Sequence, residues 1–485
     1  ATRSALGNRP VTDAQQAPPP SSAPSATRAA LRALTAALGP SKVATGDAML
    51  PWSRDDSPYP SPPPDAVVHA ASEDDVQTTI RLANEYNIPV VPRAGGTGRT
   101  GAALPLHGGI ILATDSLSGI EEISKEDLTA VVRPGVILGD LHAACIEMGL
   151  FYPPDPSSLG TCMLGGNVAT NAGGPRAFLY GSTRAWLLGV EVITGGGERL
   201  VLGGKTRKRS SGYELSQVFA GSEGTLGVAT RITLKLLPKP PETLTVAVWC
   251  RSDPGAAAVA AAILAARFSP ACLEFLDERT VDVVRGGLVV PEGGRALLIA
   301  EFDGEGVEVI AERLGNLLSG LPDVCVVHAA VDPSRREALW GVRRALSLAT
   351  RRVTRHKISE DVVVPRGSAG ALLDDVARIG ELHRVRHLTY GHAGDGNLHV
   401  NFLWNDEDEK PRVDAALDAL FRATLARGGS LSGEHGIGIA KVPWFAAEHS
   451  ATSRALQAAH KAAWDPKGIL NPGKWVGGDR NHRDC

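Results

Sequence analysis

The sequence predicts an α+β protein with more than one domain, and three observations lead to this class. The 485 residues are 43% hydrophobic and 21% charged, which is an ordinary globular composition with enough length for two or three hydrophobic cores. Short runs rich in β-branched residues alternate with turns and with stretches of helical apolar spacing. Two proline clusters, at 60–64 and 238–241, interrupt these patterns and indicate domain boundaries.

These breaks divide the chain into four expected parts. Residues 1–60 form an N-terminal tail and a helix, 61–241 a first domain, 242–440 a second domain, and 441–485 a C-terminal segment. The tail is rich in Pro, Ala, Ser and Gln up to about residue 27, so we expect it to be partly disordered. Arg3 and Arg9 precede its first acidic residue, which leaves open both a targeting remnant and a flexible arm.

The expected elements follow from apolar spacing and from helix and turn signals. In the first two parts, helices are expected at 27–38 and 73–87, and strands at 64–69, 89–93, 108–112, 128–132, 188–193 and 230–236. In the second domain, strands are expected at 244–250 and 295–302, and helices at 256–266, 307–317 and 337–352.

Charge and cysteine content exclude several classes of protein. Fifty basic and 53 acidic residues give a net charge of -3, so neither nucleic acid nor an anionic membrane is an expected partner. No apolar run approaches the roughly 20 residues of a transmembrane helix. The six cysteines contain no Cys-x-x-Cys pair, which argues against an iron–sulfur cluster and favours buried thiols in a reducing compartment. We expect a cytoplasmic or organelle-matrix protein, soluble or peripheral, and a homodimer stays open.

Three glycine-rich segments lie between expected strands. The first, Arg93-Ala94-Gly95-Gly96-Thr97-Gly98 and onward to Gly101, formally fits a dinucleotide fingerprint. Pro105 and the following glycines leave no room for the helix that this fingerprint requires, so a phosphate-binding nest of backbone N–H groups is favoured. Further segments at 165–174 and 221–227 strengthen this interpretation. Together they predict a large planar ligand that the backbone approaches closely.

A group of histidines and a carboxylate predicts a metal site. His392 is expected in a glycine-rich turn, His399 and Asn401 on one face of the strand after it, and Glu434-His435 in a second glycine-flanked loop. Two imidazoles and a carboxylate suit a divalent metal with positions left open for substrate and water. Because Glu434 and His435 are adjacent, their side chains can face different ways. One can then bind the metal while the other accepts or donates a proton.

The expected helix at 337–352 carries Arg343, Ser347 and Arg351 at a spacing of four, and Lys357 follows it. Arginine binds carboxylates with two hydrogen bonds and lysine adds a point charge, so these residues are candidates for binding an acidic substrate. A solvated basic face explains some of these arginines equally well.

The glycine-rich segments at 93–98, 165–174 and 219–227 and the segment Pro154-Asp155-Pro-Ser-Ser resemble the flavin domain of the vanillyl-alcohol oxidase type, with the D-2-hydroxyacid dehydrogenase family as the nearest match. D-lactate dehydrogenase, D-2-hydroxyglutarate dehydrogenase and the flavoprotein subunit of glycolate oxidase belong to that family. The resemblance implies a two-subdomain FAD-binding domain of the PCMH type at 61–241. It further implies an α+β substrate or cap domain with a metal site at 242–440, and a segment at 441–485 that returns to the flavin.

The resemblance also assigns roles to residues. It implies His392, His399 and Glu434 as metal ligands, His435 as the catalytic base, and Arg343, Ser347, Lys357 and Asn401 as substrate-binding residues. Ser347 is a departure, since related enzymes can carry threonine there. The implied FAD-binding residues are Arg93, Ala94, Gly95, Gly96, Thr97, Gly98, Pro154, Asp155, Gly165, Gly166, Asn167, Asn171, Gly173, Gly174, Tyr180, Gly181, Glu223, Gly224, Val228 and Asn471. Covalent relatives often carry a histidine in the first glycine loop, where this chain has Thr97, so non-covalent FAD is expected.

The implied reaction is an FAD- and metal-dependent oxidation of a D-2-hydroxy acid of the D-lactate, D-2-hydroxyglutarate or glycolate class to the 2-oxo acid. Hydride would pass to flavin N5, and the electrons would pass to an external acceptor: a quinone, an electron-transfer flavoprotein, a cytochrome or oxygen. Zinc is the favoured metal, with manganese and iron also suited. The alternatives are a metal-independent flavin alcohol or sugar oxidase, a non-catalytic flavin subunit and a metal hydrolase.

Overall fold

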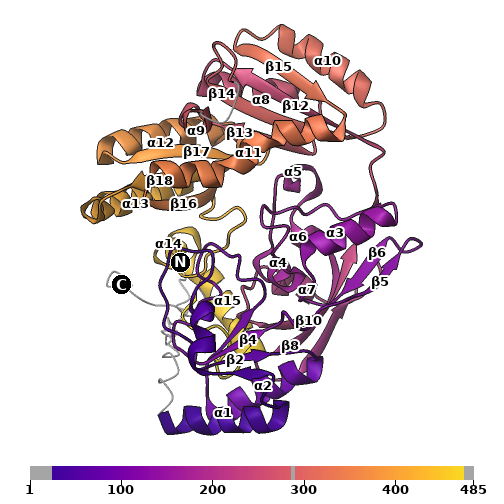
Figure 1. Cartoon of the computed structure of the whole chain (residues 1–485), viewed down its shortest axis with the longest axis vertical. Helices are drawn as coiled ribbons and strands as arrows, with labels where there is room; N and C mark the ends of the chain where they lie inside the picture. Colours follow the sequence, from indigo (N-terminus) through magenta and orange to yellow (C-terminus); the bar gives the residue numbers. More distant parts are fainter. Residues whose placement is uncertain (1–23, 286–289, 475–485) are drawn as a thin grey trace, which may run out of the picture.

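The computed structural model describes residues 24–285 and 290–474, and it divides into two halves (Figure 1). One half holds a four-stranded, a five-stranded and a two-stranded sheet with the helices of the first 240 residues. The other half is built on a seven-stranded sheet. Residues 1–23, for which disorder is expected, lie outside the described part of the chain. No described helix is both long and apolar enough to cross a membrane.

The first subdomain is a four-stranded sheet covered by two helices. Its order is β1 (Val43–Ala44), β2 (Ala66–His69), β4 (Ile110–Ala113), β3 (Val90–Arg93), with β3 and β2 both parallel to β4. Apolar residues of α1 (Pro24–Leu38) and α2 (Glu73–Tyr86) share one core with this sheet. Ser72 and Asp75 form a capping box that begins α2, and Asn87 ends it in a left-handed conformation.

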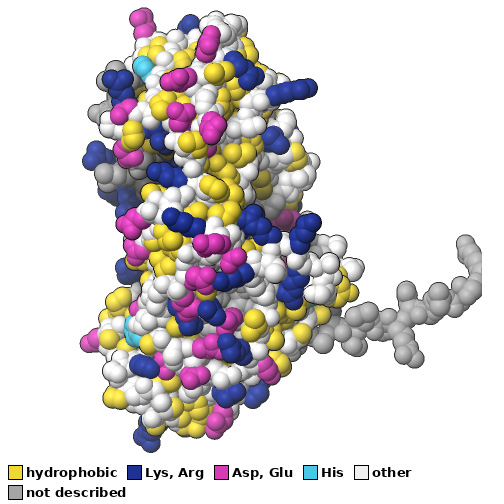
Figure 2. Space-filling view, turned by 90° about the vertical axis from the view of Figure 1, so that its right-hand side faces the viewer, with side chains coloured by type: hydrophobic (Ala, Val, Ile, Leu, Met, Phe, Trp, Pro, Cys, Tyr) yellow, Lys and Arg dark blue, Asp and Glu magenta, His cyan; other side chains and the backbone are white. Residues whose placement is uncertain are grey.

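The second subdomain is a five-stranded antiparallel sheet. Its order is β5 (Ile120–Ser124), β6 (Thr129–Val132), β10 (Gly227–Lys235), β8 (Leu187–Thr194), β9 (Arg199–Gly203). The short helices are α3 (Leu138–Glu147), α4 (Leu164–Thr170), α5 (Ala177–Tyr180), α6 (Thr183–Trp186) and α7 (Leu215–Phe219), and β7 (Leu150–Phe151) pairs with β11 (Leu237–Pro238). Acidic and basic side chains are interspersed on the face in Figure 2. On the second subdomain, Arg231 bridges Glu121 and Glu191.

The second half is a seven-stranded antiparallel sheet with helices on both faces. Its order is β15 (Val324–Ala330), β12 (Glu242–Cys250), β14 (Ala296–Gly304), β13 (Cys272–Leu276), β17 (Arg386–His392), β18 (Asn397–Trp404), β16 (His356–Val363). The helices α8 (Asp253–Ala265), α10 (Val307–Ser319), α12 (Ala369–His383) and α13 (Lys410–Ala426) pack on one face. The opposite face is covered by α9 (Glu278–Val284) and α11 (Pro333–Val353). Alternate residues of β12 enter these two cores, as the period of a strand requires.

The strand register brings five titratable side chains together. Glu274 on β13 lies opposite His392 on β17, and His399 on β18 lies opposite both Tyr390 and Asp361. The expectation that His392 belongs to a turn is wrong, because His392 is the last residue of β17. Gly391 suggested a turn, but a Cβ at this position would lie 2.5 Å from the carbonyl oxygen of Asn397. The glycine therefore permits a close approach of β18 to β17.

The other expected elements agree with the structure to within a few residues at their ends, as boundaries set by hydrogen bonding usually do. No helix follows Gly101 before β4, which agrees with the rejection of the dinucleotide fingerprint. After Glu434-His435 the chain forms α14 (Val442–Glu448) and α15 (Ala451–Trp464) and returns to the first subdomain, where Leu470 bridges Val90 of β3. Figure 1 shows both helices against the lower half.

Ion pairs connect the two halves. Arg176 contacts Asp155 at 3.1 Å in its own half and Glu301 of β14 at 2.9 Å in the other. The Tyr180 hydroxyl donates to Asp303 at 3.0 Å across the same boundary. Burial raises the pKa of Asp155 to about 7 even beside Arg176. These pairs therefore set the position of the seven-stranded sheet against the glycine-rich loops.

Replacing Arg176 by methionine should destabilise the contact between the halves. The substitution leaves Asp155 and Glu301 without a shared cation and should cost roughly 2 kcal/mol, less than a fully buried pair because Arg176 keeps some exposure. Thermal unfolding should show a lower midpoint than the wild type. Arg285→Met is the matched control, since Arg285 and Asp282 form an exposed pair one turn apart that contributes little. Equal midpoints for both variants would contradict this account.

Candidate active site

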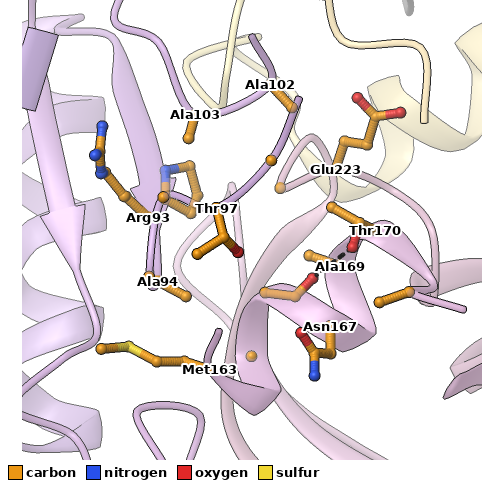
Figure 3. A pocket seen from close by; sticks show the side chains of 18 of the residues that line it. Arg93, Ala94, Thr97, Ala102, Ala103, Met163, Asn167, Ala169, Thr170 and Glu223 are labelled. Atoms are coloured by element: carbon orange, nitrogen blue, oxygen red, sulfur yellow. Dashed lines mark hydrogen bonds between the residues drawn. The ribbon is translucent and has the colours of Figure 1, made fainter. Parts of the chain in front are cut away.

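The three glycine-rich segments meet around one cleft with about 1210 Å³ of empty space, part of it open to solvent (Figure 3). Of the residues implied to bind FAD, the lining includes Arg93, Ala94, Gly95, Gly96, Thr97, Gly98, Gly165, Gly166, Asn167, Gly173, Glu223, Gly224 and Val228. Glu434 and His435 line the same cleft. The sequence-distant glycine loops and the Glu434-His435 loop therefore share one site.

Backbone contacts explain why glycine occupies key positions of the cleft. A Cβ on Gly95 would lie 2.6 Å from the carbonyl oxygen of Thr161, so the first glycine loop lies too close to the backbone just before α4 for any side chain at this position. Asn167 on α4 is 4% exposed, and its Nδ2 has no hydrogen-bond partner among the described residues. A buried donor on the wall of a cleft is suited to an acceptor on a bound ligand.

The other residues implied to bind FAD lie outside this lining. Asp155 and Tyr180 join the two halves, Asn171 accepts from Ser182 and from the Arg184 amide, and the Pro154 carbonyl contacts His142. Gly174 packs against Asp155, and Gly181 ends α5. Asn471 donates through Nδ2 to the carbonyl oxygens of Ala102 and Glu223. These seven residues support the loops in the structure, and direct contact with the cofactor stays a prediction.

Glu223 connects the third glycine loop to the loop that carries His435. Its carboxylate accepts hydrogen bonds from the amides of Ile437 and Gly438, both at 2.7 Å. Figure 3 shows the carboxylate on the side of the pale yellow C-terminal ribbon. The first glycine loop contacts the same segment, since Thr100 Oγ1 donates to the His435 carbonyl at 3.2 Å. These hydrogen bonds fix the position of the loop that carries Glu434 and His435 relative to the wall of the cleft.

The Nε2 atoms of three histidines converge on Glu434. Its Oε1 lies 3.4 Å from His392 Nε2, 3.5 Å from His399 Nε2 and 3.7 Å from His435 Nε2. His392, His399 and Glu434 can each offer one ligand atom, with all three atoms within 4.8 Å of one another. The His435 ring stacks on His399 with the centroids 5.2 Å apart. Ligand types and spacing thus fit a small divalent cation.

Two buried carboxylates that sequence reasoning missed lie behind these histidines. Glu274 hydrogen-bonds to His392 Nδ1, and Asp361 lies 3.9 Å from His399 Nδ1. Both imidazoles present Nε2 to Glu434. The hydrogen bond from a carboxylate that usually supports a metal-ligating histidine is present for His392, whereas His399 Nδ1 has no hydrogen-bond partner among the described residues. The sequence held one signal for Glu274: it is the only charged residue in the apolar strand Cys272–Leu276. Because a buried charge requires a partner, this pattern indicates a cation or a hydrogen-bond donor nearby.

The pKa values follow from burial and from this pairing. Burial opposes ionisation of Glu274, but His392 and Arg343 outweigh it and lower the pKa to about 2. The pKa of Glu434 is likewise about 2, since the hydrogen bond with His392 outweighs burial. Burial lowers the pKa of His399 to about 3 and also lowers that of His435, where Asp361 and Glu434 oppose it in part. Near neutral pH, His435 is therefore a neutral base beside ionised carboxylates.

The candidate substrate residues lie on the side of α11 and β16. Arg343 donates from Nε to Glu274 at 2.8 Å, and its guanidinium lies 4.7 Å above the Tyr390 ring. Lys357 is half-buried, and burial lowers its pKa. Asn401 is fully buried and donates to the His399 carbonyl at 2.9 Å. Arg351 is exposed at the end of α11, and the side chain of Ser347 lies outside the described part of the structure.

Comparison with known proteins agrees with this geometry. The family models "FAD binding domain" and "FAD linked oxidases, C-terminal domain" match residues 64–203 and 239–475. Glycolate oxidase subunit GlcD of Bacillus subtilis is 37% identical over 90% of this chain and 93% of its own length. D-lactate dehydrogenase of Anaerostipes hadrus is 34% identical (85% and 89%), and D-2-hydroxyglutarate dehydrogenase of Stutzerimonas stutzeri is 31% identical (90% and 96%).

Solved structures show the same fold at lower identity. p-Cresol methylhydroxylase superposes with a TM-score of 0.76 at 18% identity, covering 94% of this chain and 97% of its own. 4-Ethylphenol oxidase from Gulosibacter chungangensis gives 0.75 at 20% identity, covering 96% and 100%. The expected vanillyl-alcohol oxidase type of fold is thereby confirmed. With the cleft, the two family models and the relatives in agreement, the chain belongs to the FAD-linked oxidases and is an FAD-binding oxidoreductase of the D-2-hydroxyacid dehydrogenase and glycolate oxidase type.

Proposed function

We propose that this protein oxidises a D-2-hydroxy acid to the 2-oxo acid with non-covalent FAD and a divalent metal. One observation carries the proposal: His392, His399 and Glu434 converge at the flavin cleft with neutral His435 beside them. The relatives are named for glycolate, D-lactate and D-2-hydroxyglutarate, which share the 2-hydroxy acid group.

The cleft residues that fit FAD are the three glycine loops and Asn167 with its free donor. When bound, FAD supplies the two-electron oxidant that accepts the hydride from C2. Thr97 lies in the first glycine loop, and no histidine stands between His69 and His107, which supports non-covalent binding. The absence of a Cys-x-x-Cys motif supports an external electron acceptor, of the quinone, flavoprotein, cytochrome or oxygen type.

His392, His399 and Glu434 would hold the metal, with zinc favoured and manganese or iron also suited. Glu274 supports this assignment, because its carboxylate hydrogen-bonds to His392 Nδ1 behind the site; Asp361 lies 3.9 Å from His399 Nδ1, beyond hydrogen-bonding distance. Asp361 itself is a poor ligand, since its oxygens already accept from Asn397, Ser432 and two backbone amides. When bound, the metal supplies a Lewis acid that lowers the pKa of the substrate's 2-hydroxyl.

The remaining steps belong to side chains of the chain itself. His435 takes the 2-hydroxyl proton on Nε2, and its lowered pKa keeps this nitrogen free to accept a proton near neutral pH. Arg343 binds the substrate carboxylate through its terminal nitrogens, because Glu274 occupies Nε. Lys357 adds a second charge to that carboxylate. Ser347 and Asn401 are retained as further substrate-binding candidates.

A substrate panel with an artificial electron acceptor tests the proposed activity. The flavin-loaded protein should oxidise D-2-hydroxy acids, such as D-lactate and D-2-hydroxyglutarate, and should discriminate against their L-enantiomers, because one hydrogen on C2 faces the flavin in a fixed pose. The assay measures acceptor reduction and 2-oxo acid formation together. Oxidation of neutral alcohols or sugars in preference to every hydroxy acid would favour the metal-independent alternative.

His399→Ala should reduce bound metal well below one ion per chain while the flavin remains. The variant removes one of three protein ligands, and the residues behind the site cannot reach the vacated position. Elemental analysis and flavin absorbance measure the two cofactors on the same sample. His460→Ala is the matched control, since His460 is exposed on α15 and should keep both. Unchanged metal content in His399→Ala would refute the ligand assignment.

His435→Ala should keep metal and flavin but lose turnover by roughly 10²–10⁴-fold, the usual contribution of general acid–base catalysis. A 2-oxo acid product analogue should still bind, because Arg343 and Lys357 remain. Glu434→Ala is the informative comparison, since it should lose metal and turnover together. If His435→Ala loses its metal, or keeps nearly full activity, the base is another group.

A further inference from the structure

Arg99 brings a positive charge from the first glycine loop to the cleft that also contains His435. It lines the same cleft as His435 and Glu434 and is half-buried. Its position is fixed through the next residue: Thr100 Oγ1 donates to the His435 carbonyl, and the Thr100 carbonyl accepts from the Ile439 amide at 2.8 Å. The backbone beside Arg99 is therefore bound directly to the loop that carries His435.

Arg343, Lys357 and Arg99 differ in whether a carboxylate of the protein pairs with them. Arg343 is paired with Glu274 at 2.8 Å. Arg99 and Lys357 form no salt bridge with any residue in the described ranges 24–285 and 290–474. Burial lowers the pKa of Lys357; Arg99 and Arg351 add to the lowering, and Tyr390 opposes it.

Arg99 is half-buried, lines the cleft together with His435 and has no ion pair among the described residues, so a ligand group that covers it should carry a negative charge. An apolar substrate chain would cover Arg99 and leave its charge desolvated and unpaired, which is costly. A second carboxylate on the substrate would remove that cost and would accept two hydrogen bonds from the guanidinium.

We propose that Arg99 binds a second, distal carboxylate of the substrate, so that the preferred substrate of this chain is a D-2-hydroxy dicarboxylate. The inference rests on the proposed oxidation of 2-hydroxy acids and adds its specificity. Arg343 and Lys357 bind the first carboxylate, and His435 accepts the proton of the 2-hydroxyl. Arg99, from the flavin-binding half, binds the carboxylate at the other end of the substrate. Substrate selection is thereby divided between the two halves of the protein.

The test compares two substrates of equal carbon number, D-2-hydroxyglutarate and D-2-hydroxyvalerate, which differ in the distal carboxylate. The wild type should show a kcat/KM for the dicarboxylate higher by roughly 10- to 100-fold, the usual worth of a hydrogen bond to a charged group. Arg99→Leu should remove most of this preference by lowering the value for D-2-hydroxyglutarate alone. Arg99→Lys should retain part of it. Arg209→Leu, on an exposed basic stretch of the same half, controls for overall charge and should change neither value.

Binding of the product analogues gives a readout without turnover. Titration with 2-oxoglutarate and 2-oxovalerate, followed by flavin absorbance, should show weaker binding of 2-oxoglutarate alone in Arg99→Leu. A wild type that oxidises both substrates equally well overturns the inference while the proposed function stands. Equal losses for both substrates, or loss of the flavin from Arg99→Leu, would assign Arg99 to general positioning or to the cofactor and also overturn it. A flavin-loaded wild type that oxidises no 2-hydroxy acid would instead refute the proposed function.

Discussion

The carboxylate of Asp361 holds together the loop on which the chemistry depends. Its two oxygens accept hydrogen bonds from Asn397 Nδ2, Ser432 Oγ and the backbone amides of Glu434 and His435, all between 2.7 and 2.8 Å. Burial alone would raise the pKa of this group, but His435 and Lys441 hold it well below the usual range. A fully buried anion with this many donors stays ionised and fixes the direction of the Glu434 and His435 side chains.

The same loop is held from the other half of the protein. Glu223 accepts from the amides of Ile437 and Gly438, and Thr100 contacts the His435 carbonyl. Asp361 belongs to the seven-stranded sheet, whereas Glu223 and Thr100 belong to the glycine loops of the cleft. The loop at 434–438 is therefore bound to both halves. A shift between the halves would change the distance between His435 and the flavin cleft.

The sequence predicted the parts of this site that depend on local chemistry. The glycine loops, the strand with His399 and the Glu434-His435 pair could be identified because glycine density and histidine spacing are readable along the chain. Glu274 and Asp361 could not, because their role depends on strand register: β13 and β16 reach His392 and His399 only through long-range pairing. The prediction of a turn at His392 was wrong for a related reason: Gly391 allows β17 and β18 to approach each other closely, and this contact depends on strand pairing.

Buried charges of this kind weaken a fold more often than they strengthen it, because desolvation costs about as much as pairing returns. Glu274 illustrates what the protein gains in exchange. Its two oxygens contact His392 Nδ1 and Arg343 Nε, so one carboxylate orients a candidate metal ligand and the candidate carboxylate-binding arginine. An apolar residue at this position would pack in the strand at lower cost, but both partners would lose their fixed orientation. The orientation of His392 and Arg343 thus depends on a buried charge that is costly to place in a hydrophobic core.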